Sequence, residues 1–278
     1  MTRLAVIDPR WLVSDPTTEA YFFLAQELVQ DSRITEAGLE SVATACSKSD
    51  TVIIDNGAYE GEMLDAEVLA QMAEQIQGNI HGRYKLPYFV APDWPMEDFA
   101  ETLDAYWKFR ERLDDEIPVM LVPHAKPNDP GALATALRIA VKAQPRAIGL
   151  SILSWPAAAG PLAQSYHRPF KYGPEFLRFV MMQHVCVRNL LEVGRANGTR
   201  FHMLGWGWDW WSIRGNPCLD LIDSIDTHKP ATYAKYGMLM QKGLVVDKQL
   251  YGKGGDMDPS NILFWRNVER LKEALRLR

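Results

Sequence analysis

Short apolar runs alternate with longer stretches of helical period along most of the 278-residue chain. In the short runs, β-branched and other apolar residues follow one another, which is typical of strands buried on both faces of a parallel sheet. The expected strands are residues 4–8, 52–55, 87–91, 117–122, 147–152, 201–204, 221–225 and, as the weakest of the eight, 244–246.

The stretches between these strands repeat apolar residues every three to four positions, the spacing of a helix with one buried face. The expected helices include residues 64–76, 99–113, 133–141, 176–193 and 262–275. Eight strands with about seven intervening helices favour an α/β fold of the closed (β/α)8 TIM-barrel type, with an open doubly wound sheet as the alternative. Because no linker, repeat or low-complexity run interrupts the pattern, we expect a single domain over residues 1–278.

Composition narrows the class of protein. With 47% hydrophobic and 23% charged positions, the chain can bury a substantial core, which excludes disorder as its dominant state. A net charge of −5 argues against nucleic-acid binding driven by bulk charge but leaves room for a local basic surface. Three widely spaced cysteines fit neither a disulfide framework nor a CxxC zinc site. No secretory segment or membrane-spanning apolar run is present, so we expect a cytoplasmic protein without a membrane partner.

Carboxylates follow several of the predicted strands. Asp55, Asp93 and Asp226 would meet at the carboxyl ends of the strands, where TIM barrels place their active sites. An Asp after a strand also commonly caps the next helix or forms an Asx turn, and that alternative applies to each of the three. Paired carboxylates suit glycosidic-bond chemistry, because one attacks or stabilises the anomeric carbon while the other moves protons at the leaving group.

Five short motifs occur in the order and approximate spacing seen in the tRNA-guanine transglycosylase superfamily, whose members are TIM barrels. They are DNGAY (55–59), PD (92–93), GLS (149–151), LGWG (204–207) and DSIDT (223–227). The chain resembles that superfamily from about residue 52 to residue 227. The resemblance implies a base exchange: the N-glycosidic bond of a guanine in nucleic acid is opened, the sugar is held covalently, and a 7-deazaguanine base is joined to the same C1′.

The resemblance also implies roles for individual residues. Asp226 matches the family's nucleophile, and Asp55 matches its general acid and base. Asp93 matches the carboxylate that reads N1 and the exocyclic amine of the base, while backbone groups of Gly149 and Leu150 would contact its carbonyl oxygen. The full set of expected substrate-binding residues is Asn56, Gly57, Tyr59, Asp93, His124, Gly149, Leu150, Ser151, Gly205 and Trp206.

Three of these residues carry particular expectations. His124 falls where the family commonly has a Gln that contacts the base, and Tyr59 would pack on the bound ring. Trp206 would wall the base pocket or stack on the extruded nucleotide, whereas packing of its loop against the barrel rim is the alternative.

The zinc module of the bacterial and eukaryotic tRNA enzymes is missing from this sequence. After Asp226 the only histidine is His228, and no cysteine follows, so a ligand set cannot be assembled there. We therefore expect no metal and no other cofactor. The loss favours a resemblance to the DNA-modifying 7-deazaguanine transglycosylases of phages and bacteria, which insert bases such as preQ0 into DNA. The expected partners are DNA rather than tRNA and a free 7-deazaguanine base, with or without a partner protein for DNA access.

Basic residues offer candidate phosphate contacts. Lys229, Lys235 and Lys253 have tyrosines interleaved among them, and Arg168 lies in a loop punctuated by Pro and Gly. A solvated lysine-bearing surface is the alternative for these positions.

Several other functions remain open at this point. They are a zinc-less tRNA-guanine transglycosylase, a catalytically silent barrel that binds nucleic acid or a second subunit, a generic TIM-barrel glycosidase, and a metal-dependent hydrolase.

Overall fold

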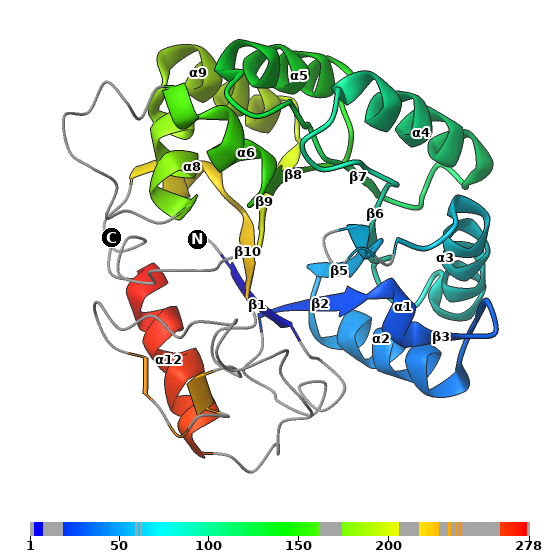
Figure 1. Cartoon of the computed structure of the whole chain (residues 1–278). Helices are drawn as coiled ribbons and strands as arrows, with labels where there is room; N and C mark the ends of the chain where they lie inside the picture. Colours follow the sequence, from blue (N-terminus) through cyan, green and yellow to red (C-terminus); the bar gives the residue numbers. More distant parts are fainter. Residues whose placement is uncertain are drawn as a thin grey trace.

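Eight parallel strands form a closed barrel in the computed structural model of the chain (Figure 1). The structure describes residues 3–7, 19–58, 61, 63–161, 174–205, 217–227, 233–234, 237, 239–240 and 262–276. The order around the barrel is β1-β10-β9-β8-β7-β6-β5-β2. Their bounds are β1 (Arg3–Ile7), β2 (Ala20–Leu24), β5 (Val52–Asp55), β6 (Tyr88–Val90), β7 (Val119–Leu121), β8 (Ala147–Ser151), β9 (Arg200–Leu204) and β10 (Ser224–Thr227). The closed parallel barrel confirms the predicted α/β fold class.

The barrel strands differ from the predicted set in two respects: one strand is missing from the set, and another begins later than predicted. The second barrel strand, β2, is missing from the predicted set, and it pairs with β1 on one side and β5 on the other. The predicted strand 244–246 lies outside the described residues, and the barrel closes without it because β1 also pairs with β10. The strand predicted at 221–225 was placed about three residues too early, since η4 (Pro217–Leu221) is a 3-10 helix and β10 starts at Ser224. Asp226 therefore lies within a strand.

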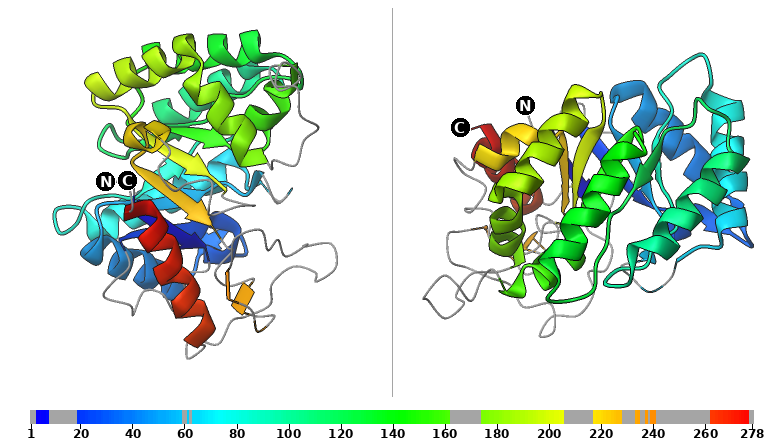
Figure 2. Two further views of the ribbon diagram at one scale, coloured as in Figure 1. Left: turned by 90° about the vertical axis from the view of Figure 1, so that its left-hand side faces the viewer. Right: turned by 90° about the horizontal axis from the view of Figure 1, so that it is seen from above.

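Helices cover the outer face of the barrel, as Figures 1 and 2 show. They are α1 (Ala25–Leu28), α2 (Glu36–Lys48), α3 (Ala66–Ile80), α4 (Phe99–Arg112), α5 (Pro130–Lys142), α6 (Ser154–Ala158), α8 (Pro174–Gln183), α9 (Val185–Ala196) and α12 (Ile262–Arg276). The two short strands β3 (Val29–Gln30) and β4 (Arg33–Ile34) form a small antiparallel hairpin. The single helix predicted over 176–193 is wrong, because His184 has extended backbone and separates α8 from α9. Among the described residues, no helix is long and apolar enough to cross a membrane.

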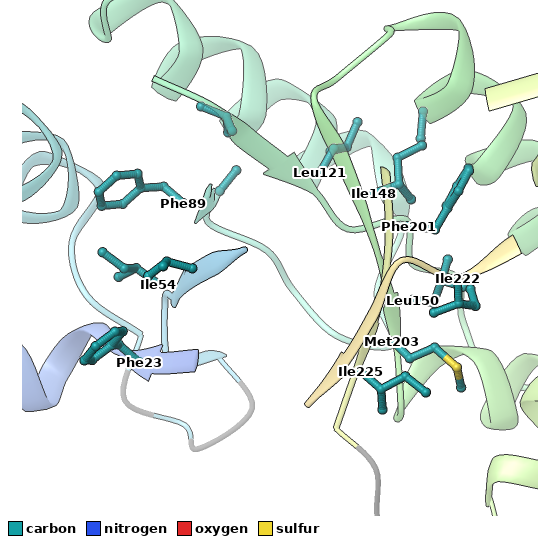
Figure 3. Close-up of a cluster of buried hydrophobic side chains, with 14 of the residues drawn as sticks. Phe23, Ile54, Phe89, Leu121, Ile148, Leu150, Phe201, Met203, Ile222 and Ile225 are labelled. Carbon is teal, nitrogen blue, oxygen red and sulfur yellow. The ribbon is translucent and has the colours of Figure 1, made fainter. Parts of the chain in front are cut away.

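Alternate residues of β2, β5, β6, β7 and β8 belong to two separate apolar clusters. The larger cluster lies between strands and helices, and Figure 3 shows its strand side chains pointing away from the barrel centre. The smaller cluster fills the barrel interior and consists of Ala20, Phe22, Ile53, Val90, Met120, Val122 and Ala147. Because side chains alternate along a strand, Asp55 and His124, each two residues beyond an interior position, are directed to the same side at the carboxyl ends of the strands.

Ion pairs gather at the opposite end of the barrel. Asp50 forms an ion pair with Arg3, and its carboxylate lies 3.4 Å from Lys85 and 3.7 Å from Arg200. The guanidinium of Arg200 lies 5.8 Å from the ring centroid of Tyr88. Charged residues at this face of a TIM barrel generally serve stability, which leaves the carboxyl ends of the strands for chemistry.

Candidate active site

A chain of buried hydrogen bonds crosses the ends of β5, β6 and β7. The Asn56 side-chain amide donates to Asp93 Oδ1 at 2.6 Å and to the Ala91 carbonyl at 2.6 Å. The other carboxylate oxygen of Asp93 is hydrogen-bonded to His124 Nε2. His124 Nδ1 lies 2.6 Å from Ser154 Oγ, at the start of α6. The network therefore brings together three of the predicted site residues: Asn56, Asp93 and His124.

The partners of Ser154 and Asp93 hold the imidazole of His124 in place. The backbone N–H of Met96 donates to Ser154 Oγ at 2.9 Å, and the same oxygen lies 2.6 Å from His124 Nδ1. Because an ionised carboxylate oxygen can only accept a hydrogen bond, His124 Nε2 donates to Asp93. Both ring nitrogens of His124 are thus engaged within the protein, and its direct partner is Asp93.

Asp226 lies at the centre of a second buried group. Its Oδ1 accepts hydrogen bonds from His202 Nε2 and from the Gly205 backbone N–H, both at 2.8 Å. Its Oδ2 is buried and has no hydrogen-bond partner among the described residues. The side chain is only 1% exposed. A buried polar atom without a partner is costly, and Oδ2 is one of five such side-chain atoms among the described residues.

His202, on β9, is held by contacts with β10 and β2. Ser224 is its neighbour in the register between β9 and β10, and His202 Nδ1 lies 2.7 Å from Ser224 Oγ. Ser224 and Asp226 are two residues apart on β10 and share one face of the strand. The imidazole therefore lies across both side chains, and it stacks on Phe22 from β2 with 5.9 Å between ring centroids.

Gly205 and Arg178 hold the backbone beside Asp226. Gly205 has a φ of +66°, in the left-handed region that favours glycine, and a Cβ there would lie 2.9 Å from Ile152 Cγ2. While its N–H points to Asp226, its carbonyl accepts a 2.6 Å hydrogen bond from Arg178 Nη2. Arg178 Nη1 donates to the carbonyls of Leu150 at 2.9 Å and Leu204 at 3.0 Å. One fully buried guanidinium on α8 thus joins the ends of β8 and β9.

Asp55 ends β5, faces the inside of the barrel and accepts a hydrogen bond within a local turn. Its Oδ2 accepts the Gly57 N–H at 3.2 Å, which is an Asx-turn contact. Gly57 has a φ of +82°, and a Cβ on it would lie 2.6 Å from Gln26 Oε1, so the turn requires glycine. Neither Asp55 nor Asp93 caps the following helix, because α3 has its N-cap at Asp65 and α4 at Asp98. The capping alternative is therefore wrong for these two carboxylates.

The β8 motif of Gly149, Leu150 and Ser151 has packing and turn roles. A Cβ at Gly149 would lie 2.6 Å from Leu204 Cδ1 and 3.0 Å from Val122 Cγ2, so the barrel interior leaves no room for a larger residue. Ser151 Oγ accepts the backbone N–H of Leu153 at 3.1 Å and forms the turn after the strand. These contacts set the path of the chain toward α6.

Some predicted residues lie outside the described residues. They are Tyr59, Trp206, Lys229, Lys235, Lys253 and Arg168. Within the described part of the chain, no cluster of three or more His, Cys, Asp or Glu side chains is arranged to hold a metal ion.

The site also contains residues that were absent from the predicted set. They are Ser154, Arg178, His202 and Ser224. For Ser224 the sequence holds a signal, since it lies two residues before Asp226 on the same strand and shares its face.

Two of the three carboxylates, Asp93 and Asp226, are each part of a Ser-His-Asp series. The series are Ser154–His124–Asp93 and Ser224–His202–Asp226. In a nucleophilic triad the serine faces the substrate and the carboxylate lies behind the histidine. Here Ser154 Oγ already accepts the Met96 N–H, and Ser224 lies two residues before Asp226, further from the carboxyl ends of the strands. These series therefore hold carboxylates in place, and they do not present a serine nucleophile.

No protein-family model matches the chain, and no curated protein matches it. Among solved structures, it is similar to a mandelate racemase/muconate lactonizing protein from Herpetosiphon aurantiacus, at 12% sequence identity and a TM-score of 0.47. The similarity covers 81% of this chain and 54% of that protein, so the chain spans about half of its length. The likeness is one of barrel fold only.

Proposed function

We propose that the protein is a DNA guanine transglycosylase that exchanges guanine in DNA for a 7-deazaguanine base such as preQ0. In the first displacement, Asp226 Oδ2 attacks C1′ as the bond from C1′ to guanine N9 breaks and its electron pair leaves with the base. In the second, the incoming base displaces Asp226 from the same carbon. Two displacements at one carbon retain the anomeric configuration.

One observation carries the proposal: the asymmetric environment of Asp226. Two donors hold Oδ1 at 2.8 Å, while Oδ2 is buried without a partner in the described part of the chain. A carboxylate is a weak nucleophile, and it gains from being held in one orientation and kept from water. The superfamily resemblance assigns the nucleophilic role to the same residue.

Asp93 and Asp55 support the proposal from neighbouring strands. The Asn56 amide and His124 Nε2 already donate to the two oxygens of Asp93, which keeps this carboxylate an acceptor with a fixed orientation. A guanine-like edge presents two donors, N1–H and the exocyclic amine, that suit such an acceptor. Asp55, inward-facing at the end of β5, is then the group that moves protons to and from the bases.

DNA is favoured over tRNA because the sequence lacks the zinc module of the tRNA enzymes. A base in a duplex must be extracted from its stack before C1′ chemistry at its sugar, so single-stranded or flipped guanine is the reacting form.

The test is incorporation of radiolabelled guanine into nucleic acid. Purified protein is incubated with the label and, separately, with duplex DNA, single-stranded DNA or bulk tRNA, and acid-precipitable counts are measured. We expect label in DNA with wild type and with the surface control Asp104→Asn, whose carboxylate pairs with Lys108 on α4, and none with Asp226→Asn. Label entering tRNA alone would overturn the DNA substrate. Label in no nucleic acid would contradict base exchange and favour a silent barrel.

A further inference from the structure

We propose that His202 is a positioning residue for Asp226 that acts mainly in the second displacement, by stabilising the carboxylate as it is released from the sugar. The inference rests on the proposed base exchange and assigns a role to a residue that neither the motifs nor the resemblance singled out. His202 lies on β9 and is 2% exposed, and each of its ring nitrogens is hydrogen-bonded to a side chain of β10.

The partner of Nε2 shows that this nitrogen carries a proton. Nε2 lies 2.8 Å from Asp226 Oδ1, and an ionised carboxylate oxygen can only accept, so Nε2–H is the donor. Ser224 Oγ lies 2.7 Å from Nδ1 and holds the other side of the ring. Stacking on Phe22, with an interplanar angle of 18°, holds the plane of the ring.

Two donors therefore converge on the same oxygen. His202 Nε2–H and Gly205 N–H both bond to Oδ1 and leave Oδ2 as the oxygen directed to chemistry. Gly205 is itself held by the Arg178 guanidinium through its carbonyl. The pair resembles an oxyanion hole in its physics, since fixed donors face an atom whose charge changes during the reaction.

The charge on Oδ1 differs between the two displacements. When the Oδ2–C1′ bond forms, the carboxylate loses its charge and Oδ1 becomes the carbonyl oxygen of a glycosyl ester. When the incoming base attacks C1′, the Oδ2–C1′ bond breaks, its electron pair returns to Asp226, and negative charge reappears on Oδ1. Donors to Oδ1 favour the charged carboxylate, so they assist its departure more than its attack.

The experiment separates the two displacements. A 5′-labelled oligonucleotide containing guanine is incubated with enzyme without free base, and the covalent adduct is followed on a denaturing gel. Excess guanine is then added, and the loss of adduct gives the rate of the second step. The variants are His202→Phe, which keeps a ring but removes the donor, and His202→Gln, whose amide can place an N–H near the Nε2 position.

We expect His202→Phe to slow loss of the adduct by about 10²–10³-fold, the effect of removing one oxyanion donor, and to slow adduct formation much less. His202→Gln should recover most of the rate, and the exposed control His81→Phe, on a side chain that is 54% exposed, should match wild type. Ser224→Ala serves as a second variant in case His202→Phe fails to fold. It removes the hydroxyl that contacts Nδ1, and it should also slow the second step.

Equal slowing of both steps, or an unchanged rate of adduct loss in folded His202→Phe, would overturn the role of His202 while leaving the base exchange standing. Absence of any adduct in wild type, together with no exchange of labelled guanine, would overturn both proposals.

Discussion

Arg178 should be among the most costly side chains to remove. Its guanidinium is 0% exposed and donates to the carbonyls of Leu150, Leu204 and Gly205 at 2.6–3.0 Å. Arg178→Met keeps much of the length of the side chain but leaves these carbonyls without their charged donor. A hydrogen bond to a charged group contributes about 1.5–3 kcal/mol, and each orphaned buried acceptor costs about 1–3 kcal/mol.

Removing the buried cation also removes its own desolvation penalty, which offsets part of this loss. The net destabilisation should therefore be about 3–5 kcal/mol, since three buried carbonyls lose their donor at about 1–3 kcal/mol each and part of this is offset. With a urea m value of about 3 kcal/mol/M, the unfolding midpoint should fall by more than about 1 M.

The assay is urea unfolding followed by circular dichroism and tryptophan fluorescence. The matched control is Arg188→Met on α9, where Arg188 forms an exposed pair with Glu192 at 3.0 Å. We expect that control to keep the wild-type midpoint. If the Arg178→Met midpoint equals that of Arg188→Met within error, the reasoning about the buried guanidinium is refuted.

Two further predictions concern the core. Gly149→Ala should destabilise the protein by about 1–3 kcal/mol because its Cβ would meet Leu204 Cδ1 at 2.6 Å, whereas Gly78→Ala, with open space at its Cβ on α3, should be neutral or stabilising in the same urea titration. Burial raises the pKa of the Cys46 thiol from 9.0 to about 12. As the pH rises, this thiol is therefore deprotonated in the unfolded chain at a lower pH than in the folded protein. Stability should then fall by about 1.4 kcal/mol per pH unit above pH 9, and Cys46→Ala should give a shallower fall; equal slopes in the two proteins would contradict this.

Hydrophobic patterning located most of the barrel but not all of its strands. The apolar residues of β5, β7 and β8 form runs bounded by polar or turn residues, and the structure places strands there. The β2 run ends directly at α1, without Gly, Pro or a polar turn between them, so the local pattern carries no boundary signal. At β10 the apolar residues of η4 extend the run toward the N-terminus and displaced the predicted start.

The site was predictable where a polar residue follows an apolar strand. Asp55, Asp93 and His124 follow this rule, and the structure joins Asp93 directly to His124 through one carboxylate oxygen and to Asn56 through the other. The role of Arg178 could not be predicted in this way, because it lies on α8 and reaches the ends of β8 and β9 only through tertiary packing. A buried arginine on a helix carries no local signal that separates it from an exposed one.

Capture of the covalent intermediate is the most direct test of the central claim. Enzyme and a guanine-containing oligonucleotide are mixed without free base, the adduct is isolated under denaturing conditions and digested, and the modified peptide is sequenced by mass spectrometry. The account predicts a deoxyribose ester on Asp226 that disappears on addition of guanine and is absent in Asp226→Asn. An ester on Asp55 or another carboxylate, or base exchange that proceeds undiminished in Asp226→Asn, would contradict it.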